Sequence, residues 1–186
     1  GRMLEPAELA DAVCGSLAAS RPLAGRKVVV SAGPTRERLD PVRFLTNRSS
    51  GKMGYAVAQA AREAGAEVVL VSGPVALPTP PGVTRVDVET AREMYDAVHA
   101  AVRGADAYIG AAAVADYQPA RVSAGKIKKD APTMTLELVR APDILASVAA
   151  LEPRPFVVGF AAETERVEEH ARAKLARKRL DLIAAH

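Results

Sequence analysis

The feature that most constrains the fold of this chain is an alternation between short Val-rich apolar runs and segments with helical spacing. Residues 27–30 and 67–71 have the length and β-branching of buried strands. Between them, apolar residues recur along one face of a helix, and Gly65 follows as a C-cap. The residues of this face are Met53, Val57, Ala60, Ala61 and Ala64. The alternation predicts an α/β domain built on a mostly parallel sheet.

Further segments continue the pattern. Thr90 and Glu93 form a capping box, which predicts a helix start. The buried face of that helix is expected to include Tyr95, Val98 and Val102. Two more helices are expected after Pro142 and after Glu163, and strands are expected at 85–88, 107–109, 134–138, 156–158 and from 181 onward.

Composition supports one folded domain. The 186 residues are 49% apolar and carry 25 Lys and Arg against 22 Asp and Glu, a net charge of +3. Cys14 is the only cysteine and the three histidines are dispersed, which excludes an internal disulfide and argues against structural zinc. The sequence holds no apolar run long enough to span a bilayer and no signal-peptide pattern. We therefore expect a cytoplasmic protein without a nucleic-acid or membrane partner.

The first 24 residues differ from the rest. Leu9, Val13 and Leu17 predict a short amphipathic helix, and residues 19–22 resemble a linker. We expect an N-terminal helix and linker over 1–24, and the folded domain over 25–186.

The loops after the strands are where a parallel sheet binds ligands. The first loop begins Ser31-Ala32-Gly33-Pro34-Thr35 and runs about twenty residues, where a dinucleotide fold has a tight glycine-rich turn. The second strand is followed by Ser72-Gly73-Pro74, with no acidic residue for a ribose hydroxyl. These features disfavour a nicotinamide-dependent reductase, which remains an alternative.

The long first loop closes with residues 47–54 at a helix N-terminus, where backbone N–H groups attract anions. Its glycines would let a phosphate approach the backbone. Thr46 and Met53 replace the first glycine and the magnesium-binding hydroxyl of a Walker A loop. The alternative is ordinary helix-start turn chemistry without a ligand.

Two later loops carry further charge. Residues 110–117 are mostly small and include Asp116. The small residues would let a flat ligand lie against the main chain, and the acid would suit Mg²⁺. The alternative is close packing of strand and helix, with Asp116 in solvent. The lysines at 126, 128 and 129 follow flexible residues, as in a lid over a polyphosphate or simply a solvated face.

The last candidates lie near the C-terminus. Residues 141–144 start a helix and offer an anion site or only an N1 proline. Phe160 could stack on a base or belong to the core. Lys174 and Lys178 share a helix face, which dipole compensation also explains. Together, the loops indicate a phosphorylated ligand, a nucleotide bound with magnesium.

As a set, these motifs resemble the bacterial phosphopantothenoylcysteine synthetase (phosphopantothenate–cysteine ligase) family. The resemblance covers about residues 25–185 and is carried by 31–35, 47–54, 111–117, 126–129, 158–164 and the pair Lys174 and Lys178. It implies a Rossmann-like α/β/α homodimer that joins 4'-phosphopantothenate to L-cysteine. CTP and Mg²⁺, with Mn²⁺ as an alternative ion, activate the carboxylate as an acyl-cytidylate.

The resemblance also implies residue roles. Asn47 and Lys126 would be catalytic, and Asp116 would contact the metal. The implied CTP-binding residues are Gly110, Ala111, Ala112, Asp116, Lys126, Ala141, Pro142, Asp143, Ile144, Phe160, Lys174 and Lys178. The implied phosphopantothenate-binding residues are Gly33, Arg43, Asn47, Ser49, Gly51 and Gly54.

The chain departs from the family pattern at both ends. Residues 1–24 match only the linker that follows a flavin-dependent decarboxylase, to which the ligase is normally fused. At His186 the family pattern continues into further strands, so we expect the sheet to lack its C-terminal strands. The third hypothesis is a nucleotide-binding module without catalytic activity.

Overall fold

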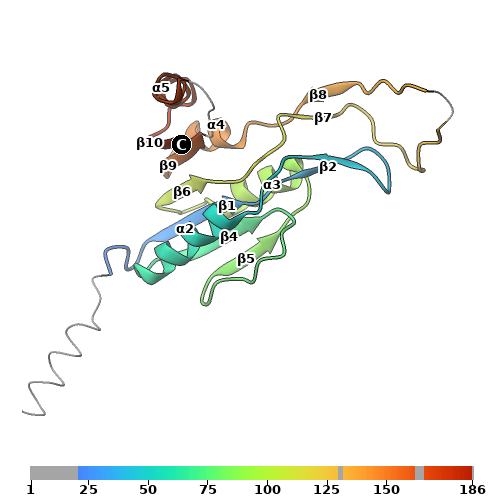
Figure 1. Ribbon diagram of the computed structural model, residues 1–186. Helices are drawn as coiled ribbons and strands as arrows, with labels where there is room; N and C mark the ends of the chain where they lie inside the picture. The colour runs from blue at the N-terminus through green and yellow to red at the C-terminus, as the bar shows by residue number, and fades with distance from the viewer. Residues whose placement is uncertain (1–20, 130–131, 162–165, 186) are drawn as a thin grey trace, which may run out of the picture.

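A computed structural model describes residues 21–129, 132–161 and 166–185 of the chain, so the predicted N-terminal helix and Cys14 lie outside the described residues. The centre is a six-stranded sheet in the order β10-β9-β6-β1-β4-β5 (Figure 1). All of its pairings are parallel. The strands are β1 (Lys27–Ala32), β4 (Glu67–Ser72), β5 (Thr84–Asp87), β6 (Ala107–Gly110), β9 (Phe156–Ala161) and β10 (Leu182–Ala185).

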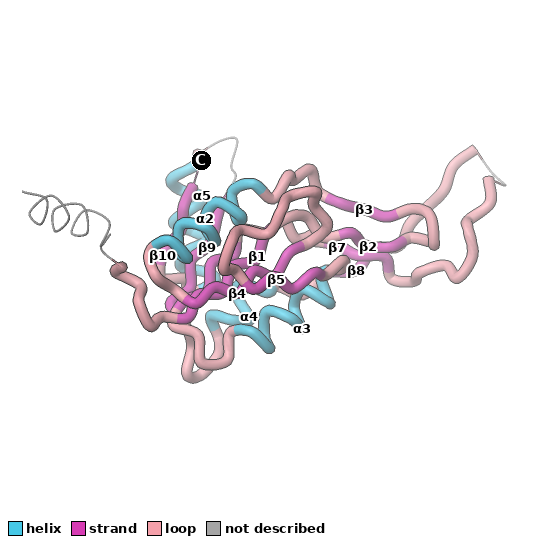
Figure 2. The backbone as a smooth tube through the Cα atoms, turned by 90° about the horizontal axis from the view of Figure 1, so that it is seen from below, coloured by secondary structure: helices cyan, strands magenta, loops and turns pink. Residues whose placement is uncertain are grey.

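Helices cover both faces of this sheet. Helix α2 (Lys52–Glu63) lies on one face and α3 (Ala91–Ala101) on the other (Figure 2). Helix α4 (Ile144–Ala149) packs beside α3, and α5 (Val167–Lys178) packs against β9 and β10. The predicted Rossmann-like three-layer α/β/α fold is confirmed.

Two apolar clusters fill the space between the layers. Val28 and Val30 of β1 pack with Ala58 of α2, whereas Val29 between them packs with Val98 of α3. Successive side chains of a strand point to opposite faces, so β1 supplies both clusters. The continuous Val run of the sequence therefore predicts a strand covered on both sides, as observed.

The predicted apolar face of α2 is shifted. Met53 is 55% exposed and Ala60 is also exposed, whereas Gly54, Tyr55, Ala58 and Ala61 are buried. This face can lie against β1 because residue 54 is a glycine: a Cβ at this position would overlap the Ala32 side chain. The predicted helix end at Gly65 is off by one residue: the C-cap residue is Ala64, and Gly65 follows it with a φ of +99°.

The predicted start of α3 is also confirmed. The Thr90 hydroxyl accepts a hydrogen bond from the Glu93 N–H, and the Glu93 carboxylate accepts one from the Thr90 N–H. Val98 and Val102 are buried as predicted. Met94 is buried as well, and Tyr95 is half-buried because its ring stacks on His99.

Two antiparallel ribbons project together from one end of the sheet (Figures 1 and 2). They are a hairpin of β2 (Arg36–Arg38) and β3 (Phe44–Thr46) and a ribbon of β7 (Tyr117–Pro119) and β8 (Leu138–Arg140). We call residues 36–46 together with the described part of 117–140 the arm. The predicted strand at 134–138 is wrong. The strand begins at Leu138 and lies outside the main sheet, and the Met134 side chain is exposed rather than packed in a core.

No helix among the described residues has both the length and the apolar content to cross a bilayer.

Candidate functional site

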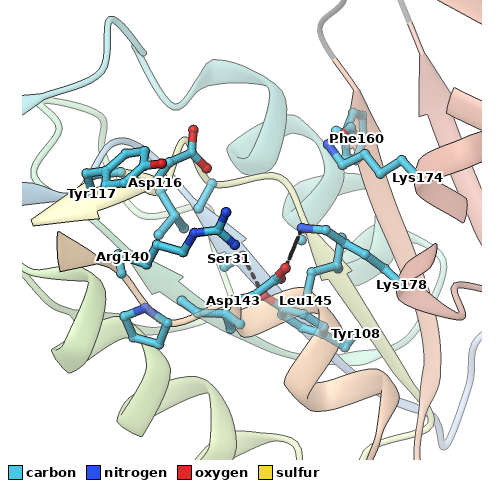
Figure 3. Close-up of a pocket in the computed structure, with 17 residues that line it drawn as sticks. Ser31, Tyr108, Asp116, Tyr117, Arg140, Asp143, Leu145, Phe160, Lys174 and Lys178 are labelled. Carbon is cyan, nitrogen blue, oxygen red and sulfur yellow. Dashed lines mark hydrogen bonds and ion pairs between the residues drawn. The ribbon is translucent and has the colours of Figure 1, made fainter. Parts of the chain in front are cut away.

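A cavity of about 440 Å³ opens at the carboxyl ends of β1, β6 and β9 (Figure 3). The chain adds β4 and β5 on one side of β1 and then β6, β9 and β10 on the other side. Sheets of this kind usually bind ligands at the carboxyl ends of the strands where the order reverses in this way. Predicted nucleotide-binding residues from four separate segments meet in the cavity. Its lining includes Gly110, Ala112, Asp116, Ala141, Pro142, Asp143, Ile144, Phe160, Lys174 and Lys178.

The floor of the cavity holds a buried hydroxyl pair. The Ser31 and Tyr108 hydroxyls share a hydrogen bond of 3.0 Å. Burial raises the pKa of Tyr108 to about 12, although the bond to Ser31 acts in the opposite direction. The phenol therefore stays neutral at physiological pH and serves as a fixed dipole rather than a base.

One wall presents two lysines that are already held in place. Lys178 pairs with Asp143, at 2.9 Å between Nζ and Oδ2, and Lys174 donates to the Phe160 carbonyl at 2.7 Å. Asp143 also caps α4 by accepting from the Ala146 N–H. Burial alone would raise the pKa of Asp143, but Lys178 and the Ala146 N–H outweigh it, and the net effect lowers the pKa. This wall is an ordered cationic surface suited to an anion.

The opposite wall carries Asp116, Tyr117 and Arg140, with the Arg140 guanidinium directed into the cavity (Figure 3). Neither the Asp116 carboxylate nor the Arg140 guanidinium has a hydrogen bond or ion pair with another described residue. Sequence reasoning missed Arg140, along with Ser31, Tyr108 and Tyr117. Arg140 stands two residues before Pro142, where a basic residue close to a predicted helix start is a usable signal, but the sequence predicts that the strand ends at 138.

Asp116 fits a limited role in metal binding. No three His, Cys, Asp or Glu residues of the described segments cluster as metal ligands. Mg²⁺ is commonly bound through one or two carboxylates, substrate phosphates and waters. A single free carboxylate facing the cavity matches an ion that arrives with a polyphosphate.

The glycines of the second predicted group bring the start of α2 onto the end of β1. Gly33 and Gly51 have φ values of +76° and +75°, and a Cβ on either would meet the Val75 side chain at 3.0 Å. The Gly51 N–H donates to the Ser49 hydroxyl at 3.3 Å. The Gly33, Gly51 and Gly54 positions are thus explained by close backbone packing, and they lie outside the cavity lining. Their arrangement leaves the positive end of α2 near the end of β1.

Asn47 lies between these two groups. Its amide nitrogen donates to the Val114 carbonyl at 3.1 Å and more weakly to the Ala113 carbonyl at 3.4 Å. Val114 lines the cavity, so Asn47 is at the cavity border. Because both donors are turned to the backbone, the amide oxygen remains as an acceptor.

Lys126, Ala111 and Arg43 are not part of the cavity lining. Lys126 lies on the exposed loop between β7 and β8, and its ammonium has no partner among the described residues. Arg43 lies on the β2–β3 hairpin and pairs with Asp40. The structure therefore brings together most of the first predicted group and leaves two charged residues on the arm.

Comparison with known proteins decides the family. Residues 23–186 match the model of the DNA/pantothenate metabolism flavoprotein C-terminal domain. The chain belongs to this family. The resemblance predicted from the motifs is confirmed by curated relatives of the same kind, proteins named "Coenzyme A biosynthesis bifunctional protein CoaBC". The Vibrio cholerae protein is 58% identical and the Escherichia coli protein 55% identical, each matching the whole of this chain.

The family match has a structural counterpart. A crystal structure of the C-terminal domain of a CoaBC protein has a TM-score of 0.78 and 47% identity, covering 88% of this chain and 78% of that one. The chain spans 47% of the length of the Vibrio cholerae and Escherichia coli relatives.

Proposed function

We propose that this chain catalyses the CTP-dependent ligation of 4'-phosphopantothenate and L-cysteine in coenzyme A biosynthesis. The observation that carries the proposal is the cavity, where most of the CTP-binding residues implied by the motifs converge at the carboxyl ends of three strands. The names of the relatives, which describe coenzyme A biosynthesis, support the same pathway. The reductase alternative is disfavoured because the first strand-end loop forms a hairpin rather than a glycine-rich turn.

In the first half-reaction, a carboxylate oxygen of phosphopantothenate attacks the α-phosphorus of CTP. The bond to the β-phosphate breaks, and pyrophosphate leaves with the electron pair. Lys174 and Lys178 would hold the nucleotide phosphates, and Lys126 would neutralise the charge that develops on the leaving pyrophosphate. When bound at Asp116, Mg²⁺ would supply further neutralisation of the triphosphate.

In the second half-reaction, the amine of cysteine attacks the acyl carbon and CMP leaves. The amine loses a proton as the amide forms. Asn47 sits at the cavity border, where its side chain could orient the acyl-cytidylate without competing as a nucleophile. Its amide oxygen, left as an acceptor by these two bonds, would accept a hydrogen bond from the incoming amine. The start of α2, with Gly33, Ser49, Gly51 and Gly54, would hold the phosphate of phosphopantothenate.

The assembly belongs to the same proposal. Most large apolar side chains that are exposed in the described residues lie on the arm: Val42, Phe44, Tyr117, Val122, Met134, Leu138 and Val139. Exposed apolar side chains gathered in one region favour a contact surface, and they support the homodimer through the sheet domain with the arm contributing to the interface. Fusion to a flavin-dependent decarboxylase would account for the additional length of the relatives.

The direct test is pyrophosphate release by the purified chain. Release should require CTP, phosphopantothenate and Mg²⁺ together, and cysteine should then yield the amide and CMP. Thermal shift with CTP, ATP, GTP and UTP side by side tests the choice of nucleotide, since selective binding to the folded state raises Tm. Stabilisation by CTP without exchange of labelled pyrophosphate into CTP, with phosphopantothenate present, would instead indicate a non-catalytic module.

A further inference from the structure

A buried carboxylate joins the two ribbons of the arm. Asp40 lies in the turn between β2 and β3, and its side chain has no exposed surface. Its Oδ1 accepts from the Val42 and Arg43 N–H groups, each at 2.8 Å. Its Oδ2 accepts from the Arg43 Nε at 2.9 Å and from the Ile127 N–H at 3.1 Å. The last of these bonds connects residues far apart in the sequence.

Arg43 completes the connection from the other side. Its Nη2 lies 2.7 Å from the Asp40 carboxylate and donates to the Ile127 carbonyl at 2.6 Å. One ion pair thus holds both backbone groups of Ile127. The Ser123 N–H also donates to the Leu39 carbonyl at 2.9 Å, so the loop is attached to the hairpin on both sides of Lys126.

The ion pair is suited to this task because its charges are well compensated. Burial alone would raise the pKa of Asp40, but the Val42, Ile127 and Arg43 N–H groups and the Arg43 side chain hold it well below its usual range. The carboxylate is therefore ionised across the physiological range. A buried charge is costly unless its hydrogen-bonding capacity is satisfied, and here four hydrogen bonds reach the buried Asp40 carboxylate.

We propose that Asp40 and Arg43 are positioning residues, which fix the loop at 123–127 so that the Lys126 ammonium is held for the reaction. The inference rests on the proposed function, in which Lys126 acts on the leaving pyrophosphate. Asn47 follows β3, at the base of the hairpin whose tip holds the Lys126 loop. One short hairpin therefore sets the spacing of the two residues expected to act on the reacting groups. The loop itself, with Gly125 in open space, has little packing of its own to do so.

This role differs from the direct substrate contact that the motifs implied for Arg43. A direct contact predicts that changes at Arg43 raise KM for phosphopantothenate whether or not Lys126 is present. A positioning role predicts a lower kcat, and this effect should disappear once Lys126 has been removed.

The first experiment is a double-mutant cycle with the full chain. Asp40→Asn places an amide where four donors now meet a carboxylate, and we expect kcat to fall about tenfold or more with the Kd for CTP nearly unchanged. In the Lys126→Gln background, the same change should alter the single-turnover rate less than about twofold. Arg43→Lys, which keeps the charge but loses the fork that reaches Ile127, should give a smaller effect with the same dependence on Lys126. Equal effects in both backgrounds would overturn the proposal.

The second experiment is hydrogen exchange, which does not depend on activity. Amides of the peptide around 123–129 should exchange faster in Asp40→Asn, while those of β1 stay protected. Asp181→Asn is the matched control, because Asp181 also pairs with an arginine, Arg154, and accepts a backbone N–H, from Val157, but at the amino end of β9. It should leave exchange in the loop unchanged. If exchange in the loop is unchanged in Asp40→Asn, the inference is overturned and the proposed function is not. If the wild-type chain shows no ligase activity, the proposed function is overturned, and the role of Lys126 with it.

Discussion

The cavity and the arm handle charge in opposite ways. At the cavity wall, Lys174 and Lys178 are fixed by partners on β9 and at the start of α4, above a floor of buried strand residues. On the arm, the ammonium of Lys126 has no partner among the described residues, and its loop is held by the ion pair of the buried Asp40 with the half-buried Arg43 and by one backbone hydrogen bond. The difference indicates a division of work. Under the proposed function, the sheet would supply a preformed surface for binding, and the arm would supply a group that acts during the chemical step.

The largest expected effect is the loss of Lys126. Lys126→Gln should lower kcat for pyrophosphate release by about 10²–10³-fold, the usual loss for one group that stabilises developing charge. Tm should hardly change, because the side chain is exposed and unpaired. Lys128→Gln, with the same charge change two residues away, is the control and should retain most activity. An unchanged rate in Lys126→Gln would remove the proposed division of work.

A glycine pair tests the rigidity of the two regions. In Gly54→Ala, the new Cβ would overlap Ala32 of β1, and we expect a loss of about 2–3 kcal/mol in the free energy of unfolding, as for overpacked cores. Gly125→Ala on the arm meets nothing within 4 Å and should be neutral or slightly stabilising. Urea titration of both variants measures the difference. Similar losses in the two would mean that the arm is packed as tightly as the sheet.

Asn47 lies where the two regions meet, and its substitution should separate the half-reactions. Asn47→Asp keeps the shape but replaces the donors to Val114 with a charge. We expect acyl-cytidylate to form while amide formation slows by about tenfold or more, corresponding to a loss of roughly 1.4 kcal/mol in transition-state stabilisation. Rapid quench with labelled CTP would show the accumulating intermediate. Intact cysteine-dependent turnover in this variant would contradict the role assigned to Asn47.

The smallest effect concerns pH and the cavity wall. Folding lowers the pKa of Asp143 below its ordinary value of 3.8, so its charged form contributes stability that is present above that value and lost as the pH falls through the folded pKa. Asp143 is 49% exposed, so after solvent screening we expect Asp143→Asn to lower Tm at neutral pH by only about 1–2 °C. The difference from the wild type should shrink in acid. A difference that stays constant down to about pH 2 would show that the carboxylate charge does not matter to stability.

The parts of the fold that the sequence predicts well are those with two buried faces or an explicit cap. The runs at 27–30 and 67–71 become β1 and β4 almost without change, and Thr90 starts α3 as its capping box indicates. The face of α2 is misassigned because apolar spacing alone favours Met53, whereas close approach to the sheet requires Gly54. Apolar periodicity overlooks glycine, which has no side chain to count, even where the glycine is the residue that lies closest to the sheet.

The candidate site shows a similar limit. Residues in strand-end loops were found because topology sends those loops to one edge, and the cavity confirms that they meet. Apart from the strand misplaced at 134–138, the sequence predicts no strands in the arm, because β2, β3, β7 and β8 are only three residues long each and have little apolar alternation. Asp40 was missed for a related reason. The sequence predicts that an acidic residue in a turn is exposed to solvent. Asp40 is buried only because the loop between β7 and β8 packs over it.

The hydroxyl pair beneath the cavity has a consequence for assembly of the sheet itself. Tyr108 pairs with Val29, two residues before Ser31 in β1, and it belongs to the apolar cluster that contains Val29 and Val98. If β6 shifted by one residue along β1, the phenol would turn to the α2 side, and the Ser31 and Tyr108 hydroxyls would lose the hydrogen bond that they share. Strands made only of valine would lose no polar contact in such a shift. The shared hydrogen bond therefore favours the observed register of β6 and β1 over a shift by one residue, and this register brings both hydroxyls to the floor of the cavity.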